Sequence, residues 1–259
     1  MIIQTFTWIG QLSLNICGSV GTFILFCVQF LKTLTSTQLR IRKVLVQLDS
    51  IGVNSLMITL ITGTFSGAVL AVQTFKGFQQ FGGEELLGPV VALSMAREIG
   101  PILTGLMVTA RAGSAITAEI GLMKATEQLS AMEVMAVSPV ARIIAPRFWA
   151  GMISMPILAT IFSMVGILGG YFIAVLVIGV DEGAFWSQMQ ANVDFSNDIV
   201  DGAIKSIVFG FACTIIALFE GFDAPPTAEG VSRATTRTVV ISSLAVLGLD
   251  FILTSFMFV

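Results

Sequence analysis

Residues 50–75 read SIGVNSLMITLITGTFSGAVLAVQTF, and none of these side chains is charged. A helix that crosses the hydrocarbon core of a bilayer needs about 20 predominantly apolar residues. Because the stretch exceeds that length and its polar side chains are all neutral, it predicts a membrane-spanning helix. This prediction decides the class of the fold, since the rest of the chain repeats the pattern.

Four more apolar stretches follow along the chain. Each is about 20 residues or longer, and each carries at most two charged residues. The sequence therefore predicts an all-α integral membrane protein with five transmembrane helices and a single domain over residues 1–259. The four further stretches are residues 86–110, 148–180, 199–219 and 238–259.

The N-terminal part of the chain has a different character. Residues 8–31 are long enough to span, but Gln, Asn, Ser and Thr side chains dilute them, and an amphipathic run follows. Both features are typical of a helix that lies in the membrane interface. We expect residues 1–48 to form an interfacial, amphipathic segment ahead of a transmembrane core over residues 49–259. A spanning helix at residues 8–31 is the alternative.

The composition excludes several classes of protein. The chain is 55% hydrophobic and 11% charged, with a mean hydropathy of +0.93 and no histidine. Soluble domains are about 25% charged, so lipid must surround much of this surface. The absence of a basic tract argues against nucleic-acid binding. Cys17, Cys27 and Cys213 lie in apolar stretches without the spacing of a metal site, so we expect no bound metal.

The loop charges predict how the chain is oriented. If five helices alternate, most Lys and Arg residues of the loops fall on one side of the membrane, while Lys76 lies on the other side among acidic residues. Basic loops remain cytoplasmic, so the C-terminus at Val259 is expected to face outward. The cations on the predicted cytoplasmic side are Arg40, Arg42, Lys43, Arg111, Lys124, Arg142, Arg147, Arg233 and Arg237.

Residues 111–147, RAGSAITAEIGLMKATEQLSAMEVMAVSPVARIIAPR, are too polar to span but rich in helix formers. Thr126 to Met135 is predicted to form a short amphipathic cytoplasmic helix between the second and third spans, with Leu129, Met132, Val134 and Met135 on its apolar face. Such a helix either rests on its own protein and the membrane surface or inserts into the groove of a partner. The residues alone leave both options open.

Small residues predict contacts between helices. Gly63 with Gly67, and Gly166 with Gly170, form GxxxG pairs, which let two helix backbones approach closely in lipid. A glycine followed by Pro101 predicts a kink or break in the second span.

Arg97, Glu98, Lys205 and Asp250 are charged residues inside predicted spans. A charge at the centre of a spanning helix costs about 2.5–3.5 kcal/mol, so each is expected to find a partner on another helix. Glu98 with Lys205 is one expected pair, and Asp250 with a cation is another. The set is either a clamp that fixes helix register or a polar layer beside a lipid cavity, in which Arg97 would meet a phosphate. A proton relay through a carboxylate is a third reading.

The outer end of the first strong span continues as LAVQTFKGFQQF over residues 70–81. Leu70, Phe78 and Phe81 are candidates to line an apolar, outward-opening cavity for acyl chains, together with Arg97. Ordinary lipid-facing or core packing is the alternative.

Several long runs resemble one known family. RAGSAITAEIGLMKATEQLSAMEVMAVSP in the cytoplasmic segment, ALSMAREIGPILTGL at residues 92–106, PRFWAGMISMP at residues 146–156 and SRATTRTVVISSLAVLGLDFILT at residues 232–254 are similar to MlaE-type permeases, the membrane subunit of the Mla phospholipid ABC transporter. The resemblance extends from about Asp49 to the C-terminus.

That resemblance implies a set of partners. Such permeases are homodimers in the bacterial inner membrane, and their N-terminal segment is interfacial. A coupling helix of each protomer enters a groove of an ATPase subunit, to which a STAS-domain protein binds. A hexameric ring of MCE-domain subunits covers the periplasmic face, and glycerophospholipid moves between the inner and outer membranes. The coupling residues implied here are Glu119, Thr126, Glu127, Leu129, Met132 and Glu133.

The resemblance also implies that ATP and magnesium bind to the partner and that this chain binds no cofactor. The chain has no GxxxxGK[ST] phosphate loop. A proton-coupled secondary transporter that uses Glu98 or Asp250 is the runner-up, and a membrane scaffold without transport activity is a third possibility. An enzyme is disfavoured because no nucleophile–base constellation is visible.

Overall fold

The computed structural model describes residue 18 and residues 21–32, 41–80 and 82–257, and these are almost entirely helical, with no β-strand among them. Most π-helical turns (η) are continuous with the α-helices beside them; η2 is a 3-10 turn. The elements are α2 (Ile41–Leu48), η1 (Asp49–Val53), α3 (Asn54–Gln79), η2 (Glu84–Leu86), α4 (Leu87–Leu93), η3 (Ser94–Ile99), α5 (Gly100–Val108), η4 (Thr109–Gly113), α6 (Ser114–Ala125), α7 (Gln128–Val134), η5 (Val140–Ile144), α8 (Ala145–Tyr171), η6 (Phe172–Ile178), α9 (Glu182–Asn192), α10 (Phe195–Asp223) and α11 (Ala228–Met257).

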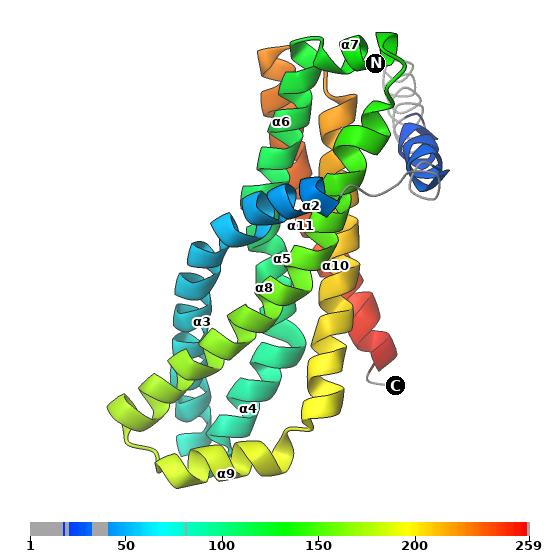
Figure 1. Ribbon diagram of the computed structural model, residues 1–259. Helices are drawn as coiled ribbons and strands as arrows, with labels where there is room; N and C mark the ends of the chain where they lie inside the picture. Colours follow the sequence, from blue (N-terminus) through cyan, green and yellow to red (C-terminus); the bar gives the residue numbers. More distant parts are fainter. Residues whose placement is uncertain (1–17, 19–20, 33–40, 81, 258–259) are drawn as a thin grey trace, which may run out of the picture.

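Five helical units within the described residues are long and apolar enough to cross a membrane, which confirms the all-α membrane fold. They run alternately between an end that carries α7 and an end that carries α9 (Figure 1). The units are Ile41–Gln79, Glu84–Ala125, Val140–Ile178, Asp198–Asp223 and Ala228–Met257.

The second helical unit is longer than the sequence predicted. The predicted span ends at residue 110, but helix continues through η4 and α6 to Ala125. Polar side chains in this extension bond to other helices. Arg111 donates from Nη1 to the Ser50 carbonyl at 2.7 Å, and Thr117 donates to the Ala217 carbonyl at 2.9 Å. These partners explain why a segment too polar for lipid remains helical.

The predicted GxxxG pairs face each other. A Cβ on Gly67 would overlap the Gly166 carbonyl, one on Gly63 would lie 3.0 Å from the Phe162 carbonyl oxygen, and one on Gly170 would lie 3.3 Å from the Gly67 carbonyl oxygen. The backbones of α3 and α8 therefore touch where these glycines meet. In lipid, this close packing replaces the hydrophobic driving force that soluble helices use.

Pro101 changes the helix without ending it. The π-helical turn η3 immediately precedes Gly100 and Pro101, and α5 continues directly from it. Proline has no backbone N–H and its ring crowds the preceding turn; a π-bulge widens that turn. The expected irregularity is therefore a local widening at η3, and it falls on the segment that carries Arg97 and Glu98.

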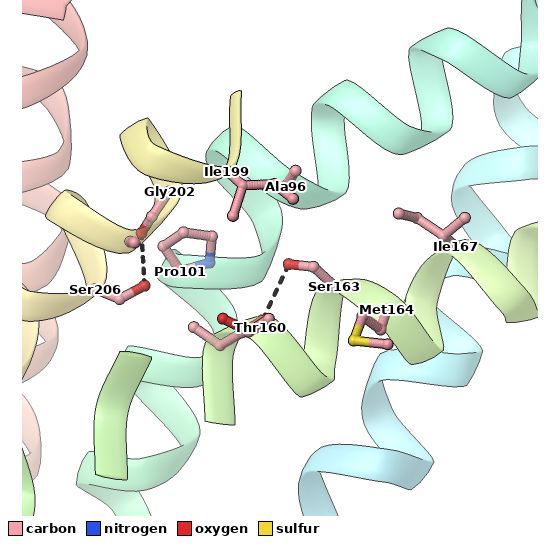
Figure 2. A pocket seen from close by; sticks show the side chains of 11 residues that line it. Ala96, Pro101, Thr160, Ser163, Met164, Ile167, Ile199, Gly202 and Ser206 are labelled. Atoms are coloured by element: carbon pink, nitrogen blue, oxygen red, sulfur yellow. Dashed lines mark hydrogen bonds between the residues drawn. The ribbon is translucent and has the colours of Figure 1, made fainter. Parts of the chain in front are cut away.

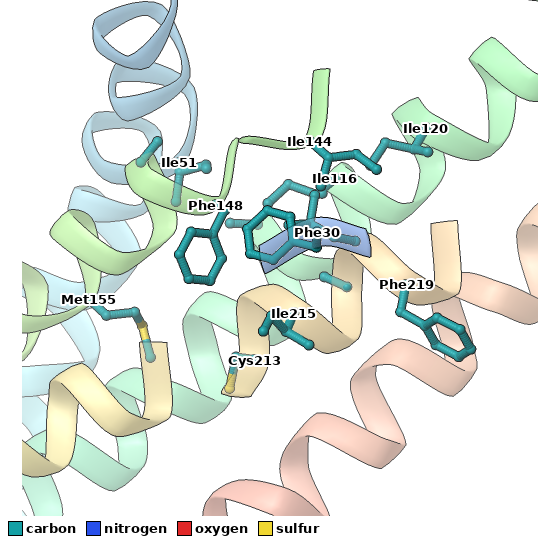
Figure 3. Close-up of a cluster of buried hydrophobic side chains, with 14 of the residues drawn as sticks. Phe30, Ile51, Ile116, Ile120, Ile144, Phe148, Met155, Cys213, Ile215 and Phe219 are labelled. Atoms are coloured by element: carbon teal, nitrogen blue, oxygen red, sulfur yellow. The ribbon is translucent and has the colours of Figure 1, made fainter. Parts of the chain in front are cut away.

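An aromatic core holds the N-terminal helix against the bundle. Phe30 is buried and packs edge-on against Phe148 of α8, with ring centroids 4.8 Å apart. Phe26 contacts Phe219 of α10 at 5.7 Å. Figure 3 shows Phe30, Phe148 and Phe219 within this cluster of buried side chains.

The prediction for residues 8–31 is addressed only in part. The apolar helix Gly21–Lys32 is shorter than the about 20 residues that a span needs. Residues 8–17, 19 and 20 lie outside the described part of the chain, so this helix length holds only within the described residues. Next along the chain, α2 crosses the bundle at an angle to the long helices (Figure 1), and its end at Leu48 coincides with the predicted boundary between the amphipathic segment and the core.

Candidate functional site

Lys205 of α10 lies at the centre of a buried polar cluster. Its side chain is 2% exposed, and its Nζ contacts Glu98 Oε1 of η3 at 2.6 Å. On α11, Nζ donates to Thr254 Oγ1 at 2.7 Å and lies 3.4 Å from Asp250 Oδ1. The expected Glu98–Lys205 pair is confirmed, and the cation expected for Asp250 is the same lysine.

The cluster joins three segments that are far apart in sequence. The Lys205 ammonium lies near two carboxylates, those of Glu98 and Asp250. Asp250 Oδ1 makes no hydrogen bond with a described residue, so Asp250 and Lys205 form a longer-range ion pair. Thr254 Oγ1 lies 3.4 Å from Glu98 Oε1, within hydrogen-bond reach. Because buried charges are costly in lipid unless paired, the arrangement holds η3, α10 and α11 together.

Arg97 forms a second ion pair between η3 and α10. Its Nε donates to Asp198 Oδ1 of α10 at 2.7 Å, and Asp198 is almost fully buried while the Arg97 side chain is 29% exposed. The guanidinium therefore has a protein carboxylate as its partner, and its predicted contact with a phosphate remains a prediction. Sequence reasoning placed Asp198 in a loop. Its spacing from Lys205, which is two helical turns, was the signal for a shared face.

A small cavity adjoins η3. It is lined by Ala96 and Pro101 together with Ser163 of α8 and Gly202 of α10, and its volume is about 80 Å³. Figure 2 shows these side chains around it. Sites for drug-sized ligands measure about 300–1,000 Å³, so this space is too small for a phospholipid.

Arg97, Leu70 and Phe78 do not line the small cavity beside η3. Leu70 on α3 is partly buried and packs against an apolar cluster that includes Phe162 and Phe185. Phe78 is partly exposed near the end of α3. Phe81 lies outside the described residues. Leu70 thus fits the core-packing alternative within one protomer, and the cavity role of these residues is untested.

A helix is present where the sequence predicted one over residues 126–135, and it is shorter than expected. Helix α7 covers Gln128–Val134, and Glu127 before it adopts a left-handed conformation with φ 58°. Leu129 is buried and Met132 packs against the core, so these two side chains anchor α7 to its own protein. Outward-facing apolar side chains follow: Val134 is 88% exposed and Met135 is 65% exposed.

The other predicted coupling residues surround this helix. Thr126, Glu127 and Glu133 are exposed. Glu119 of α6 lies 2.8 Å from Nη2 of Arg147 on α8 and is 47% exposed. Leu129 is buried against the core of its own chain, and the coupling role of all these residues stays a prediction.

Further contacts fix the α7 end of the bundle. Lys124 donates from Nζ to the Phe222 carbonyl of α10 at 2.7 Å. Glu220 of α10 is buried and pairs with Arg237 of α11 at 3.0 Å. α6, α10 and α11 are therefore held together at the end of the bundle that carries α7.

Comparison with known proteins agrees with this architecture. A permease of Haemophilus influenzae named "Intermembrane phospholipid transport system permease protein MlaE" is 57% identical over 212 residues, covering 82% of this chain and 81% of that protein. A probable ABC transporter permease of Rickettsia typhi is 35% identical over 100% of this chain and 99% of its own length. The chloroplastic protein TRIGALACTOSYLDIACYLGLYCEROL 1 of Arabidopsis thaliana is 33% identical over 84% of this chain and 62% of its length.

The family model described as Permease MlaE matches residues 44–256. This match covers all five candidate spans except a few terminal residues, and it includes η3 with its charges and the α7 region. The chain therefore belongs to the MlaE permease family.

Proposed function

We propose that this chain is the permease subunit of an ABC transporter that moves glycerophospholipids between the inner and outer membranes and so maintains outer-membrane lipid asymmetry. The observation that carries the proposal is the 57% identity, over most of both chains, to a permease named for intermembrane phospholipid transport. The permease itself hydrolyses no ATP, and ATP with its magnesium binds to a separate ATPase subunit.

Helix α7 is the part that contacts this ATPase. It ends the bundle at one extremity (Figure 1), and Val134 and Met135 are the large apolar side chains it exposes there. Isolated exposed apolar residues are common, but two neighbours on a short helix anchored by Leu129 suit a helix-in-groove contact. Thr126, Glu127 and Glu133 supply the polar rim of that contact.

The functional unit is a homodimer. Helix α11 is the least buried of the five spans, and Leu244, Phe251 and Phe256 are 65%, 76% and 80% exposed. This face is available to a second copy and to the lipid that the two copies would enclose. Leu70, Phe78, Phe81 and Arg97 are assigned to that shared cavity.

The α7 end is cytoplasmic in a bacterial inner membrane, and the C-terminus is periplasmic. The basic residues Lys124, Arg142 and Arg233 belong to the α7 end, whereas Glu182 of α9 belongs to the other. This asymmetry follows the positive-inside rule. On the periplasmic side, a hexameric MCE-domain subunit would receive the lipid, and a STAS-domain protein would bind the ATPase.

The mechanism that this geometry supports is a rigid-body switch. Nucleotide turnover in the ATPase displaces α7, and the contacts of Lys124 and Glu220 carry the displacement into α10 and α11. The Lys205 cluster keeps η3 moving with these helices. The cavity between two protomers then opens or closes toward the periplasm.

The test is a mild-detergent pull-down of the full chain from its native membrane, with mass spectrometry of the bound proteins and lipids. We expect an ATPase, an MCE-domain protein and phospholipid to co-purify. The same complex in proteoliposomes should move fluorescent phospholipid only with hydrolysable ATP. Recovery of the folded chain alone, or lipid movement driven by a proton gradient, would contradict the proposal and favour a secondary transporter.

A further inference from the structure

A basic groove lies at the level of α2, distant from the Lys205 cluster. Residues of α2, α6, η5 and the start of α8 line it, and its volume is about 560 Å³. Four of the lining side chains are cationic: Arg42, Lys43, Arg142 and Arg147. Its described lining contains no acidic side chain, so the groove concentrates positive charge.

Arg147 is the buried cation of this groove. It is 5% exposed, and its Nη2 pairs with Glu119 at 2.8 Å. Its Nε is buried and makes no hydrogen bond with any described residue. A buried guanidinium N–H without an acceptor is costly, and an anion held nearby would lower that cost.

The rim carries exposed positive charge. Arg42 and Arg142 are exposed, and neither forms an ion pair within the described parts of the chain. Guanidinium groups bind phosphate oxygens in a bidentate manner. Two such groups at the rim and a third in the floor can therefore surround one phosphate.

The groove is also bounded by apolar surface. Val46 lines it and is 62% exposed, and Ile41 and Leu45, at adjoining positions of α2, are 70% and 60% exposed. A helix with cations on one side and large exposed apolar residues beside them is typical of the membrane interface. Acyl chains lying along α2 would therefore meet the groove at the depth of the headgroups.

We infer that this groove binds the phosphate of an anionic glycerophospholipid from the leaflet at the α7 end, with the acyl chains against α2. Basic pockets between transmembrane helices on the cytoplasmic side are typical binding sites for anionic headgroups. The site is separated from the proposed transport cavity, which lies toward the far end of α3. The inference uses the proposed orientation of the chain, and it does not depend on lipid transport.

The experiment titrates phosphatidylglycerol into the purified full-length chain in neutral detergent and counts bound lipid by native mass spectrometry. The test variant is Arg42→Ala with Arg142→Ala. Each cation near an anionic lipid is worth about fivefold in affinity, which corresponds to about 1 kcal/mol. We therefore expect phosphatidylglycerol to bind about 25-fold more weakly to the double variant, and phosphatidylcholine binding to change less.

The matched control removes the same net charge elsewhere. Lys76→Ala with Arg233→Ala takes away two cations outside the groove; Arg233 is 76% exposed on its side chain and pairs only with its helix neighbour Glu229. Gel filtration confirms that each variant is folded. The control should retain wild-type affinity, and Arg142→Lys should retain most of it.

Three results would overturn the inference. Equal binding to the wild type and the test variant would exclude the groove as the site, and an equal loss in the control would reduce the effect to net charge. Inorganic phosphate that displaces phosphatidylglycerol at equal concentration would show that the groove selects free phosphate rather than lipid. If the wild-type complex moved no lipid in proteoliposomes while the titrations gave the expected result, the proposed function would fail and this site would stand.

Discussion

At the scale of single residues, Arg97, Glu98, Lys205 and Asp250 each lie against an opposite charge that another helix supplies. Lys205 is 2% exposed and has two carboxylates and a hydroxyl around it, contributed by η3 and α11. Desolvation of a buried ion pair offsets much of its attraction. We therefore interpret the cluster as a set of contacts that specifies which helices pack together and in which register along their axes.

Substitution Lys205→Met tests that view. It leaves Glu98 and Asp250 facing each other without a cation, and removal of one partner of a buried pair costs about 3–5 kcal/mol. The Glu98 side chain is 30% exposed, so we expect a loss near the lower end of that range. The measurement is the midpoint of thermal unfolding of the detergent-purified chain.

The control is Lys76→Met, which removes a cation near the end of α3 that is exposed. A triple variant that adds Glu98→Gln and Asp250→Asn should recover much of the lost stability, because it removes the uncompensated charges. Equal midpoints for Lys205→Met and Lys76→Met would show that the cluster contributes nothing to the fold.

Sequence reasoning could find the Glu98–Lys205 pair because two intramembrane charges of opposite sign must be compensated. It could not find the partner of Arg97, since Asp198 lies just before the predicted span and looked like a loop acid. Hydropathy locates the apolar part of a helix and does not say where the helix begins. The structure begins α10 at Phe195, which brings Asp198 within the helix and onto the face of Lys205.

At the scale of elements, the contact between α3 and α8 depends on the absence of side chains. Gly67 meets the Gly166 backbone with no space for a Cβ. Gly77 lies on the same helix, and nothing lies within 4 Å of a Cβ built there. Gly67 and Gly77 therefore offer a matched comparison within α3, one at a close contact and one in open space.

We expect Gly67→Ala to destabilise the protein by about 1–3 kcal/mol, because overpacking forces helices apart, although alanine is the better helix former. Gly77→Ala should be neutral or slightly stabilising. Thermal unfolding in detergent distinguishes the two. If Gly67→Ala unfolded at the same temperature as Gly77→Ala, the close approach of α3 and α8 would be refuted.

The short helix α7 gives a prediction about coupling. Val134→Glu introduces a charge at a side chain that is 88% exposed, so the fold should tolerate it. If Val134 enters the ATPase groove, burial of the new charge should weaken the complex about tenfold or more, which corresponds to about 1.4 kcal/mol. ATP turnover of the purified complex and its dissociation in gel filtration are the readouts.

Gln128→Glu is the control for this substitution, because it adds the same charge at the first residue of α7, where the helix dipole favours it. It should leave ATP turnover unchanged. Normal turnover with Val134→Glu would remove α7 from the coupling path. Periodicity predicted the existence of α7 and grouped Leu129 with Met132, Val134 and Met135 on one apolar face, but it left open what that face contacts. Which apolar side chains face the protein depends on packing against α6 and α10, and a ten-residue pattern does not contain that information.

At the scale of the whole molecule, the five spans were predictable because each is a long apolar run and lipid imposes one solution on such runs. The continuation of helix to Ala125 was not predictable from hydropathy, since its polar residues are stabilised by Ser50 and Ala217 on other elements. The loop charges add an orientation, which can be tested directly.

Cysteine accessibility provides that test. In a variant without Cys17, Cys27 and Cys213, Ser187→Cys on α9 should react with a membrane-impermeant maleimide in intact spheroplasts. Val134→Cys on α7 should react only after the membrane is permeabilised. The opposite pattern would invert the orientation and would place α7 where no cytoplasmic ATPase can reach it.

Helix α11 is the span with the least burial, yet two polar contacts with α10 lie far apart along it. Arg237 bonds to Glu220 at 3.0 Å, and Thr254 accepts from Lys205 at 2.7 Å. At 1.5 Å per residue these points are separated by about 25 Å along the helix axis. A slide of α11 by a single turn would break both contacts, and so would a rotation about its own axis. Any displacement of α11 in the membrane must therefore carry α10 with it.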